Sequence, residues 1–107
     1  MKAWEIYSYQ HPDWPEPHPA VIVSHPDRVA LKPEVTILLC STKSATRPAK
    51  SHEVILDPSD GLDWPTVCKC DVLYTLPTTA LTGRRGMVTP ERRRQIIATI
   101  NHAMGWV

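Results

Sequence analysis

The histidine at position 18 is the side chain in this sequence best suited to proton transfer. It stands between Pro17 and Pro19, directly before the apolar run from Ala20 to Val23. Proline has a fixed φ and no N–H to donate, so Pro19 fits the first position of a strand and not its middle. Imidazole titrates near neutral pH, at about 6.5 in model peptides, and can take or give a proton there. The pattern predicts a candidate acid or base at the rim of a buried strand, although many loop histidines have no such role.

A second pair of candidates lies on the expected strand from Thr66 to Tyr74. Residues two apart on a strand share a face, so Lys69 and Asp71 would face one cleft, with Cys68 and Cys70 on the other side. A carboxylate can accept a proton, and an ammonium can stabilise negative charge that builds on a phosphate. These roles suit attack of a ribose 2′-hydroxyl on its own phosphate. An ion pair without a catalytic role is the alternative.

Two hydroxyl side chains follow the apolar run Val35–Cys40. Either Ser41 or Thr42 could donate to a phosphate oxygen, but hydroxyl groups at strand ends commonly cap the local backbone.

Basic side chains gather in the last quarter of the chain, a pattern that suits a polyanionic ligand or a solvated helix face. They are Arg84, Arg85, Arg92, Arg93 and Arg94.

The three cysteines lack the spacing of a usual zinc site. One residue separates Cys68 from Cys70, whereas zinc sites commonly place two to four between cysteines. A site that also used Cys40 and a histidine is the alternative, but buried cysteines commonly act as small hydrophobic residues. Phosphate-binding glycine loops and the common metalloprotease and hydrolase motifs are also absent from the sequence. We therefore expect core positions for the cysteines, with no metal and no other cofactor.

Two tryptophans, Trp14 and Trp64, each precede a proline in an expected turn. Exposed aromatic rings can stack on unpaired bases. Burial in the core or against a second subunit is the favoured interpretation, because a small core without phenylalanine needs other large side chains.

The elements expected to position these groups are short strands followed by one helix. Strands are expected over Trp4–Tyr9, Ala20–Ser24, Val35–Cys40, Glu53–Leu56 and Thr66–Tyr74, with an irregular loop over Gln10–His18 and a short helical turn within His25–Pro33. Thr89 as N-cap, Pro90 at the first helical position and Gly105 after the last apolar residue delimit the terminal helix. This order favours a mainly β domain, strongly bent into a small barrel, with the helix packed against it.

Length and composition favour a single domain over residues 1–107. No run approaches the roughly 18 apolar residues of a membrane span, and the first residues lack the apolar core of a signal peptide. Three cysteines, an odd number, fit a reducing compartment better than a disulfide framework. We therefore expect a cytoplasmic protein.

Taken in order, these segments resemble the MazF/PemK (Kid) toxin family of type II toxin-antitoxin systems over essentially the whole chain. The segments that carry the resemblance are Ala3–Tyr7, His18–Ser24, Leu39–Thr42, Glu53–Leu56, Gly61–Leu62, Lys69–Asp71 and Gly86–Glu91. Two arginines of the family pattern are replaced here by His18 and Lys69, and a threonine by Ser41. Lysine keeps the charge of arginine but loses its planar, two-pronged contact with phosphate. The upstream Gly-His-Glu-Gln element of the family has only an approximate counterpart, His11–Asp13.

The resemblance implies a homodimeric, SH3-like (CcdB/PemK-like) barrel that cleaves single-stranded mRNA at short sequences without a metal. It also implies inhibition by a cognate antitoxin, through which DNA would be contacted. The implied catalytic residues are His18, Ser41, Asp71 and Lys69. Contacts with RNA are expected from Thr42, Lys43, Arg47, His11, Arg84 and Arg85. Because the site is altered, a barrel with weakened or lost catalysis that binds nucleic acid or protein is the alternative.

Overall fold

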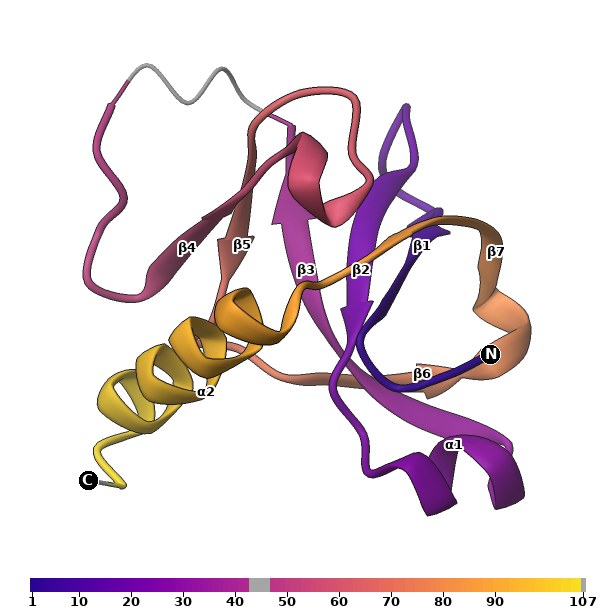
Figure 1. Cartoon of the computed structure of the whole chain (residues 1–107). Coiled ribbons are helices and arrows are strands. Elements are labelled where there is room, and N and C mark those ends of the chain that lie inside the picture. The colour runs from indigo at the N-terminus through magenta and orange to yellow at the C-terminus, as the bar shows by residue number, and fades with distance from the viewer. Residues whose placement is uncertain (43–46, 107) are drawn as a thin grey trace.

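The computed structural model describes residues 1–42 and 47–106, in which short strands alternate with turns and a long helix ends the chain (Figure 1). In chain order the elements are β1 (Glu5–Tyr9), β2 (His18–Ile22), α1 (Pro26–Leu31), β3 (Glu34–Ser41), β4 (Glu53–Leu56), the 3-10 turn η1 (Pro58–Asp60), β5 (Thr66–Lys69), β6 (Tyr74–Pro77), the 3-10 turn η2 (Thr78–Ala80), β7 (Leu81–Met87) and α2 (Pro90–Met104). None of the helices in the described ranges is long and apolar enough to span a membrane.

The strands form one antiparallel sheet in the order β4-β5-β3-β2-β1-β7. The remaining strand, β6, pairs with the first half of β3 on the side opposite β2, the side on which β5 pairs with the end of β3. The expected mainly β architecture with a C-terminal helix is confirmed. In the part of the chain that the structure describes, β4 and β7 end the strand order and are not paired with each other.

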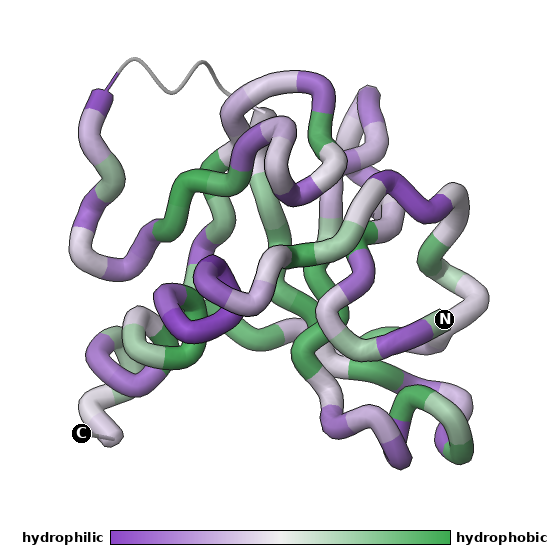
Figure 2. The backbone as a smooth tube through the Cα atoms, in the orientation of Figure 1, coloured by the Kyte–Doolittle hydropathy of each residue, from purple (hydrophilic) through white to green (hydrophobic). Residues whose placement is uncertain are grey.

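The central strands β2 and β3 are buried on both faces. On one face, Val21 and Leu38 belong to an apolar cluster that includes Ile96 of α2. On the other face, Ala20 and Ile37 belong to a second cluster. Figure 2 shows the apolar residues gathered along these strands. Two-sided burial explains the unbroken apolar run that begins at Ala20. The expectation that strand β2 is covered on both faces is confirmed.

The expected single strand over Thr66–Tyr74 is wrong, because the chain forms β5 and β6 on different parts of β3. Cys68 lies opposite Cys40, and Tyr74 lies opposite Ile37. From Cys68 to Tyr74 the chain advances six residues, while their partners on β3, Cys40 and Ile37, are only three residues apart. Three residues are therefore extruded from the ladder. This insertion, like a large bulge, redirects the side chains that follow it.

Strand β7 was not expected from the sequence, since two glycines and two arginines weaken the strand pattern there. The second glycine, Gly86, is required by a close approach: a Cβ at that position would lie 2.2 Å from the carbonyl oxygen of Asp60. The turn η1 therefore rests directly on the backbone of β7.

The expected terminal helix is confirmed with its predicted ends. The Thr89 side chain accepts the N–H of Arg92, Pro90 occupies the first turn, and Gly105 adopts φ +70° at the C-terminal end. The short helical turn expected between β2 and β3 is also present, as α1.

Candidate functional site

Strand register places three of the predicted catalytic residues on one face of the sheet. Ala20 lies opposite Leu39, and Cys68 lies opposite Cys40. Residues directly opposite each other on antiparallel strands point to the same face, and residues two apart on one strand share a face. By this alternation, His18, Ser41 and Lys69 lie on the same face of the sheet as Ala20 and Leu39.

These three side chains border a hollow of about 200 Å³. Its lining residues are Trp14, His18, Leu39, Cys40, Ser41 and Lys69. Apolar groups make one wall, while an imidazole, a hydroxyl and an ammonium converge on the same space. This combination of apolar lining with few polar groups is typical of small-molecule sites, and its two basic side chains favour an anionic ligand.

The imidazole of His18 is held by the main chain of β3. Its Nδ1 atom lies 3.2 Å from the carbonyl oxygen of Cys40. A carbonyl oxygen can only accept a hydrogen bond, so Nδ1 must carry the proton. Nε2 is then the ring nitrogen left for a ligand, as an acceptor in the neutral ring and a donor in the imidazolium.

The loop before His18 brings His11 and Trp14 close to the site. The rings of His11 and Trp14 are stacked, with centroids 4.5 Å apart, and the Trp14 and His18 centroids are 4.7 Å apart. Nδ1 of His11 accepts the N–H of Asp13. The half-buried Trp14 thus contacts both histidines, and it lines the hollow whereas His11 does not.

Lys69 and Asp71 do not share a strand face, which corrects the sequence prediction. Lys69 is the last residue of β5, and Asp71 lies beyond it in an exposed bend within the extruded segment. Lys69 lines the hollow and Asp71 does not. The alternative ion pair between these two described residues is also not formed, so the Lys69 ammonium is available to an anion.

The polar segment after β3 is only partly described. Thr42 is exposed directly after the strand, and Lys43, a predicted RNA contact, lies outside the described residues. Arg47 forms a two-pronged contact with Glu53, with nitrogen–oxygen distances of 2.7 and 3.1 Å. Its guanidinium is therefore already engaged, and contact with RNA would compete with this ion pair.

The Arg47–Glu53 pair predicts acid-sensitive stability. Hydrogen bonds from Arg47 outweigh burial and lower the pKa of Glu53 to about 2. Because the pKa is lowered in the folded state, the stabilisation is present above the ordinary carboxyl pKa and is lost as pH falls from about 4.5 to 2. We expect Glu53→Gln to lower the free energy of unfolding by about 1–2 kcal/mol at pH 7, allowing for screening at the half-exposed arginine, with the difference vanishing near pH 2. Urea unfolding at several pH values measures this effect.

Glu16→Gln is the matched control, because Glu16 is exposed in a loop. It should not change stability at either pH. A Glu53→Gln variant whose loss of stability were the same at pH 7 and pH 2 would show that the ion pair is not its source.

The two predicted RNA contacts on β7 lie away from the hollow. Arg84 is exposed and bonds through Nε to the buried carboxylate of Glu5 on the neighbouring strand β1. Although burial opposes ionisation, hydrogen bonds from Arg84 and the Lys2 N–H lower the pKa of Glu5. Arg85 is partly buried on the same strand. Neither lines the hollow, and their contact with RNA stays a prediction.

The cysteines are core residues, as expected. Cys40, Cys68 and Cys70 are all free thiols and buried. Contact with the Cys40 thiol, together with burial, raises the pKa of Cys68, and contact with Cys68 does the same for Cys70. Such thiols stay protonated and are poor nucleophiles.

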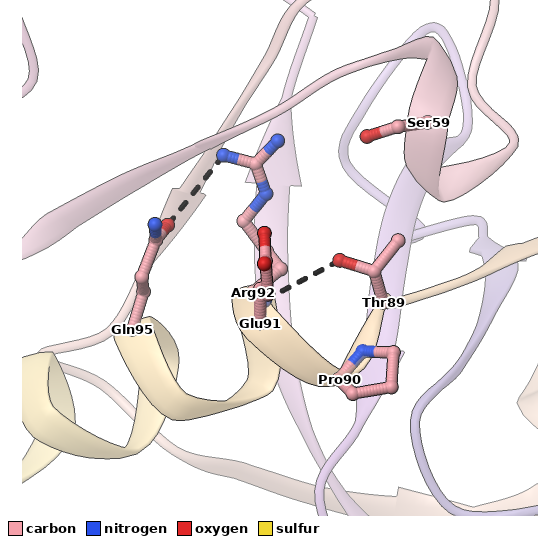
Figure 3. A pocket seen from close by; sticks show the side chains of 6 residues that line it. All are labelled: Ser59, Thr89, Pro90, Glu91, Arg92 and Gln95. Atoms are coloured by element: carbon pink, nitrogen blue, oxygen red, sulfur yellow. Dashed lines mark hydrogen bonds between the residues drawn. The ribbon is translucent and has the colours of Figure 1, made fainter.

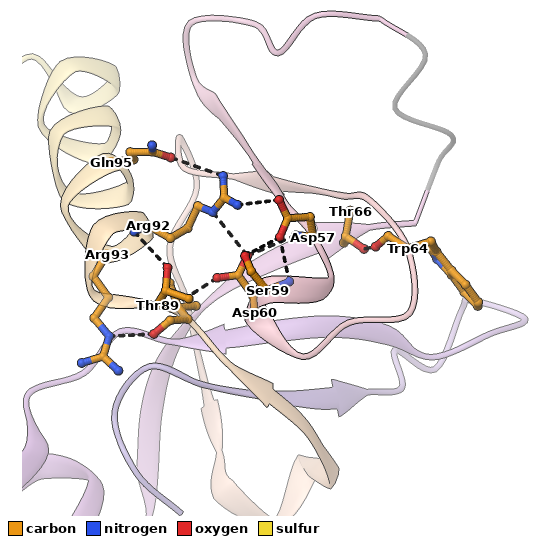
Figure 4. A network of polar contacts seen from close by, with 10 residues as sticks. Asp57, Ser59, Asp60, Trp64, Thr66, Thr89, Arg92, Arg93 and Gln95 are labelled. Carbon is orange, nitrogen blue, oxygen red and sulfur yellow. Dashed lines mark hydrogen bonds and ion pairs between the residues drawn. The ribbon is translucent and has the colours of Figure 1, made fainter.

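A second hollow, of about 400 Å³, lies beside the first turn of α2 (Figure 3). Its arginine, Arg92, is already paired with two carboxylates, Asp57 at 2.8 Å and Asp60 at 3.3 Å. The fully buried Asp60 also accepts the N–H groups of Asp57 and Thr89 (Figure 4). This network fixes η1 to the start of α2. Because each of these charged groups already has partners within the network, its role is structural, and the hollow around His18 is the candidate site.

Sequence reasoning missed the position of Trp14. It favoured burial in the core or at a subunit contact, whereas the ring belongs to neither core cluster and lines the hollow; contact with a second subunit stays a prediction. Its proximity to His18, four residues along the same loop, was the available signal, but spacing within an irregular loop does not determine where a side chain points.

Comparisons with known proteins agree with this fold. A family model described as "PemK-like, MazF-like toxin of type II toxin-antitoxin system" matches residues 3–104. An endoribonuclease solved in complex with its cognate antitoxin from a Mycobacterial species is 23% identical, with a TM-score of 0.83, over 100% of this chain and 97% of that one. The Mycobacterium tuberculosis toxin MazF-mt6 is 22% identical, with a TM-score of 0.78, over 94% of this chain and 96% of that one.

A more distant structure, MazE-MazF from Deinococcus radiodurans, is 12% identical, with a TM-score of 0.75, over 98% of this chain and 95% of that one. At these identities the structural likeness establishes a shared fold. No curated protein sequence matches the chain.

Proposed function

Because the chain belongs to the family of PemK-like, MazF-like toxins of type II toxin-antitoxin systems, we propose that it is an endoribonuclease that cuts single-stranded RNA at the hollow around His18. One observation carries this proposal: a histidine with Nδ1 fixed by a carbonyl oxygen and Nε2 left for a ligand borders the same hollow as a lysine ammonium. These two groups supply proton transfer and positive charge, which cleavage of RNA by its own 2′-hydroxyl requires.

In the proposed reaction, Nε2 of neutral His18 takes the proton of the ribose 2′-hydroxyl. The 2′-oxygen forms a bond to the adjacent phosphorus, and the bond from phosphorus to the 5′-oxygen of the next nucleotide breaks. The Lys69 ammonium stabilises the negative charge that builds on the phosphate oxygens, and the Ser41 hydroxyl contributes a hydrogen bond to the phosphate. In an in-line displacement the leaving 5′-oxygen is on the far side of phosphorus, so water supplies its proton.

Asp71 has no assigned step in this scheme. It lies in the extruded segment after β5 and does not line the hollow. Its catalytic role, expected from the family resemblance, stays a prediction, as do the contacts of RNA with Thr42, Lys43, Arg47, His11, Arg84 and Arg85.

A cleavage assay on a mixed-sequence single-stranded RNA, in the presence of a metal chelator, tests the proposal. We expect fragments with a 2′,3′-cyclic phosphate and a 5′-hydroxyl, because the attacking oxygen belongs to the RNA. An oligonucleotide with 2′-deoxyribose at the cut position is the matched control and should stay intact.

The second candidate function is that of a binding module. It is favoured by the replacement of two arginines of the family pattern with His18 and Lys69. RNA that is bound but left intact in the same assay would support this function and exclude the enzyme. RNA that is neither bound nor cut would exclude both the enzyme and an RNA-binding module, and only a module that binds DNA or protein would then fit.

We further propose that the chain is one SH3-like barrel domain over residues 1–107, cytoplasmic and homodimeric, and held inactive by a cognate antitoxin that could also bind DNA. The family membership supports this, as do the two relatives solved with antitoxin partners. A monomer in a sizing measurement would exclude the dimer.

A further inference from the structure

An aromatic cluster lies beside the His18 imidazole. It consists of Tyr9 at the end of β1 and of His11 and Trp14 in the following loop. Trp14 is its centre: its ring centroid lies 4.5 Å from His11, 6.2 Å from Tyr9 and 4.7 Å from His18. The ring planes of Trp14 and His18 are inclined at 63°, close to the edge-to-face arrangement that aromatic pairs favour.

The loop that carries Trp14 is held in place by its own hydrogen bonds. The Gln10 side-chain amide donates to the carbonyl oxygens of Trp14, at 2.7 Å, and His11, at 3.0 Å. The Trp14 N–H donates to the His11 carbonyl oxygen, and the Asp13 N–H donates to the His11 ring. Since three prolines, Pro12, Pro15 and Pro17, also restrict this segment, the indole is presented at a defined place.

We propose that Trp14 is a positioning residue for His18, an inference that rests on the proposed function. The hydrogen bond to the Cys40 carbonyl oxygen fixes one edge of the imidazole. This bond alone leaves the imidazole free to tilt about it. The ring could also release the bond and present Nδ1 to the substrate instead of Nε2. The indole packed against the ring removes this freedom, so that Nε2 is the nitrogen presented to the substrate.

A competing role for Trp14 is to stack on a nucleobase of the RNA. The geometry favours positioning, because the indole is already stacked on His11 and packed against His18. The two roles differ in their kinetic effect. Loss of a positioning contact lowers kcat, since misplacement of a catalytic group by about 1 Å can cost about 100-fold. Loss of a base contact mainly raises KM.

The test uses Trp14→Ala and Trp14→Phe, with Trp64→Ala as the matched control, since the Trp64 ring is half-exposed and outside the hollow. The first readout is the nitrogen spectrum of the histidine rings in the free protein, with His18 assigned by His18→Ala. Wild type and Trp64→Ala should show His18 protonated at Nδ1. In Trp14→Ala, we expect a mixture of the two neutral tautomers, and Trp14→Phe should restore the single form.

The second readout is RNA cleavage. Trp14→Ala should lower kcat about 10- to 100-fold with KM changed less than about threefold, and Trp14→Phe should recover most of kcat. A wild-type-like tautomer in Trp14→Ala, or a loss confined to KM, would overturn the proposal. Because the tautomer is measured without RNA, it decides the positioning role even if the wild type proves not to cut RNA. Thermal unfolding of each variant confirms its fold, and Trp14→Leu replaces Trp14→Ala if the latter is unfolded.

Discussion

Replacing His18 with alanine is expected to lower the rate of RNA cleavage by about 10²- to 10⁴-fold, the range typical of a lost general acid or base. The imidazole is the group in the hollow that can take a proton from a 2′-hydroxyl near neutral pH. The fold should persist, because His18 begins β2 and is only partly buried. Single-turnover cleavage of a labelled RNA measures the loss, and binding of a 2′-deoxy analogue should change little.

Two further substitutions separate the roles that His18 could have. His18→Asn keeps an N–H donor for the Cys40 carbonyl oxygen but cannot titrate, so it should be as inactive as His18→Ala while preserving the local structure. His18→Arg restores the residue of the family pattern, with a permanent positive charge. If His18→Arg were as active as the wild type, charge rather than proton transfer would be the contribution of this position.

Replacing Gly86 with alanine is expected to cause the largest loss of stability, about 3 kcal/mol or more. The added Cβ would lie 2.2 Å from the Asp60 carbonyl oxygen and 3.1 Å from the Cα of Gly61. Both contacts are to backbone, so the turn η1 would have to move. That movement would also strain the bonds from the Asp60 carboxylate to Thr89 and Arg92. Thermal unfolding should show a midpoint lowered by roughly 12–24 °C.

Gly83→Ala is the control for this experiment, because it lies on the same strand. A Cβ there would contact nothing within 4 Å, and its φ of +62° is the source of strain. The expected cost is about 1–2 kcal/mol, from backbone strain alone. Equal losses in the two variants would mean that η1 can withdraw from β7 without penalty.

Local sequence signals were sufficient to predict a strand or helix whose position depends only on the residues within and beside it. Prolines and the apolar run located β2, but the observed strand, His18–Ile22, begins and ends two residues before the predicted Ala20–Ser24. The capping residues Thr89 and Gly105 located α2 within a residue of its observed ends. The error at Thr66–Tyr74 has a different origin. A run of β-branched and aromatic residues shows strand propensity, but it does not show that the chain pairs with β3 in two registers separated by three extruded residues.

The candidate site was predictable where it depends on strands and not where it depends on loops. His18, Ser41 and Lys69 border one hollow because side chains alternate along each strand and the pairing of β2, β3 and β5 places these three on one face; the alternation follows from the predicted strands, whereas the pairing does not. Asp71 was misplaced relative to Lys69 because the insertion after β5 interrupts that alternation. Trp14 and the ion pair of Arg47 with Glu53 depend on loop conformation, which residue spacing does not encode.

The acceptor that orients the His18 imidazole belongs to the main chain of β3. Every amino acid at position 40 would provide the same carbonyl oxygen, so a substitution at position 40 does not remove the acceptor of this hydrogen bond. The Cys40 side chain meanwhile lies in the core cluster. A substitution at position 40 is therefore constrained by packing and not by this hydrogen bond, because the acceptor belongs to the sheet itself.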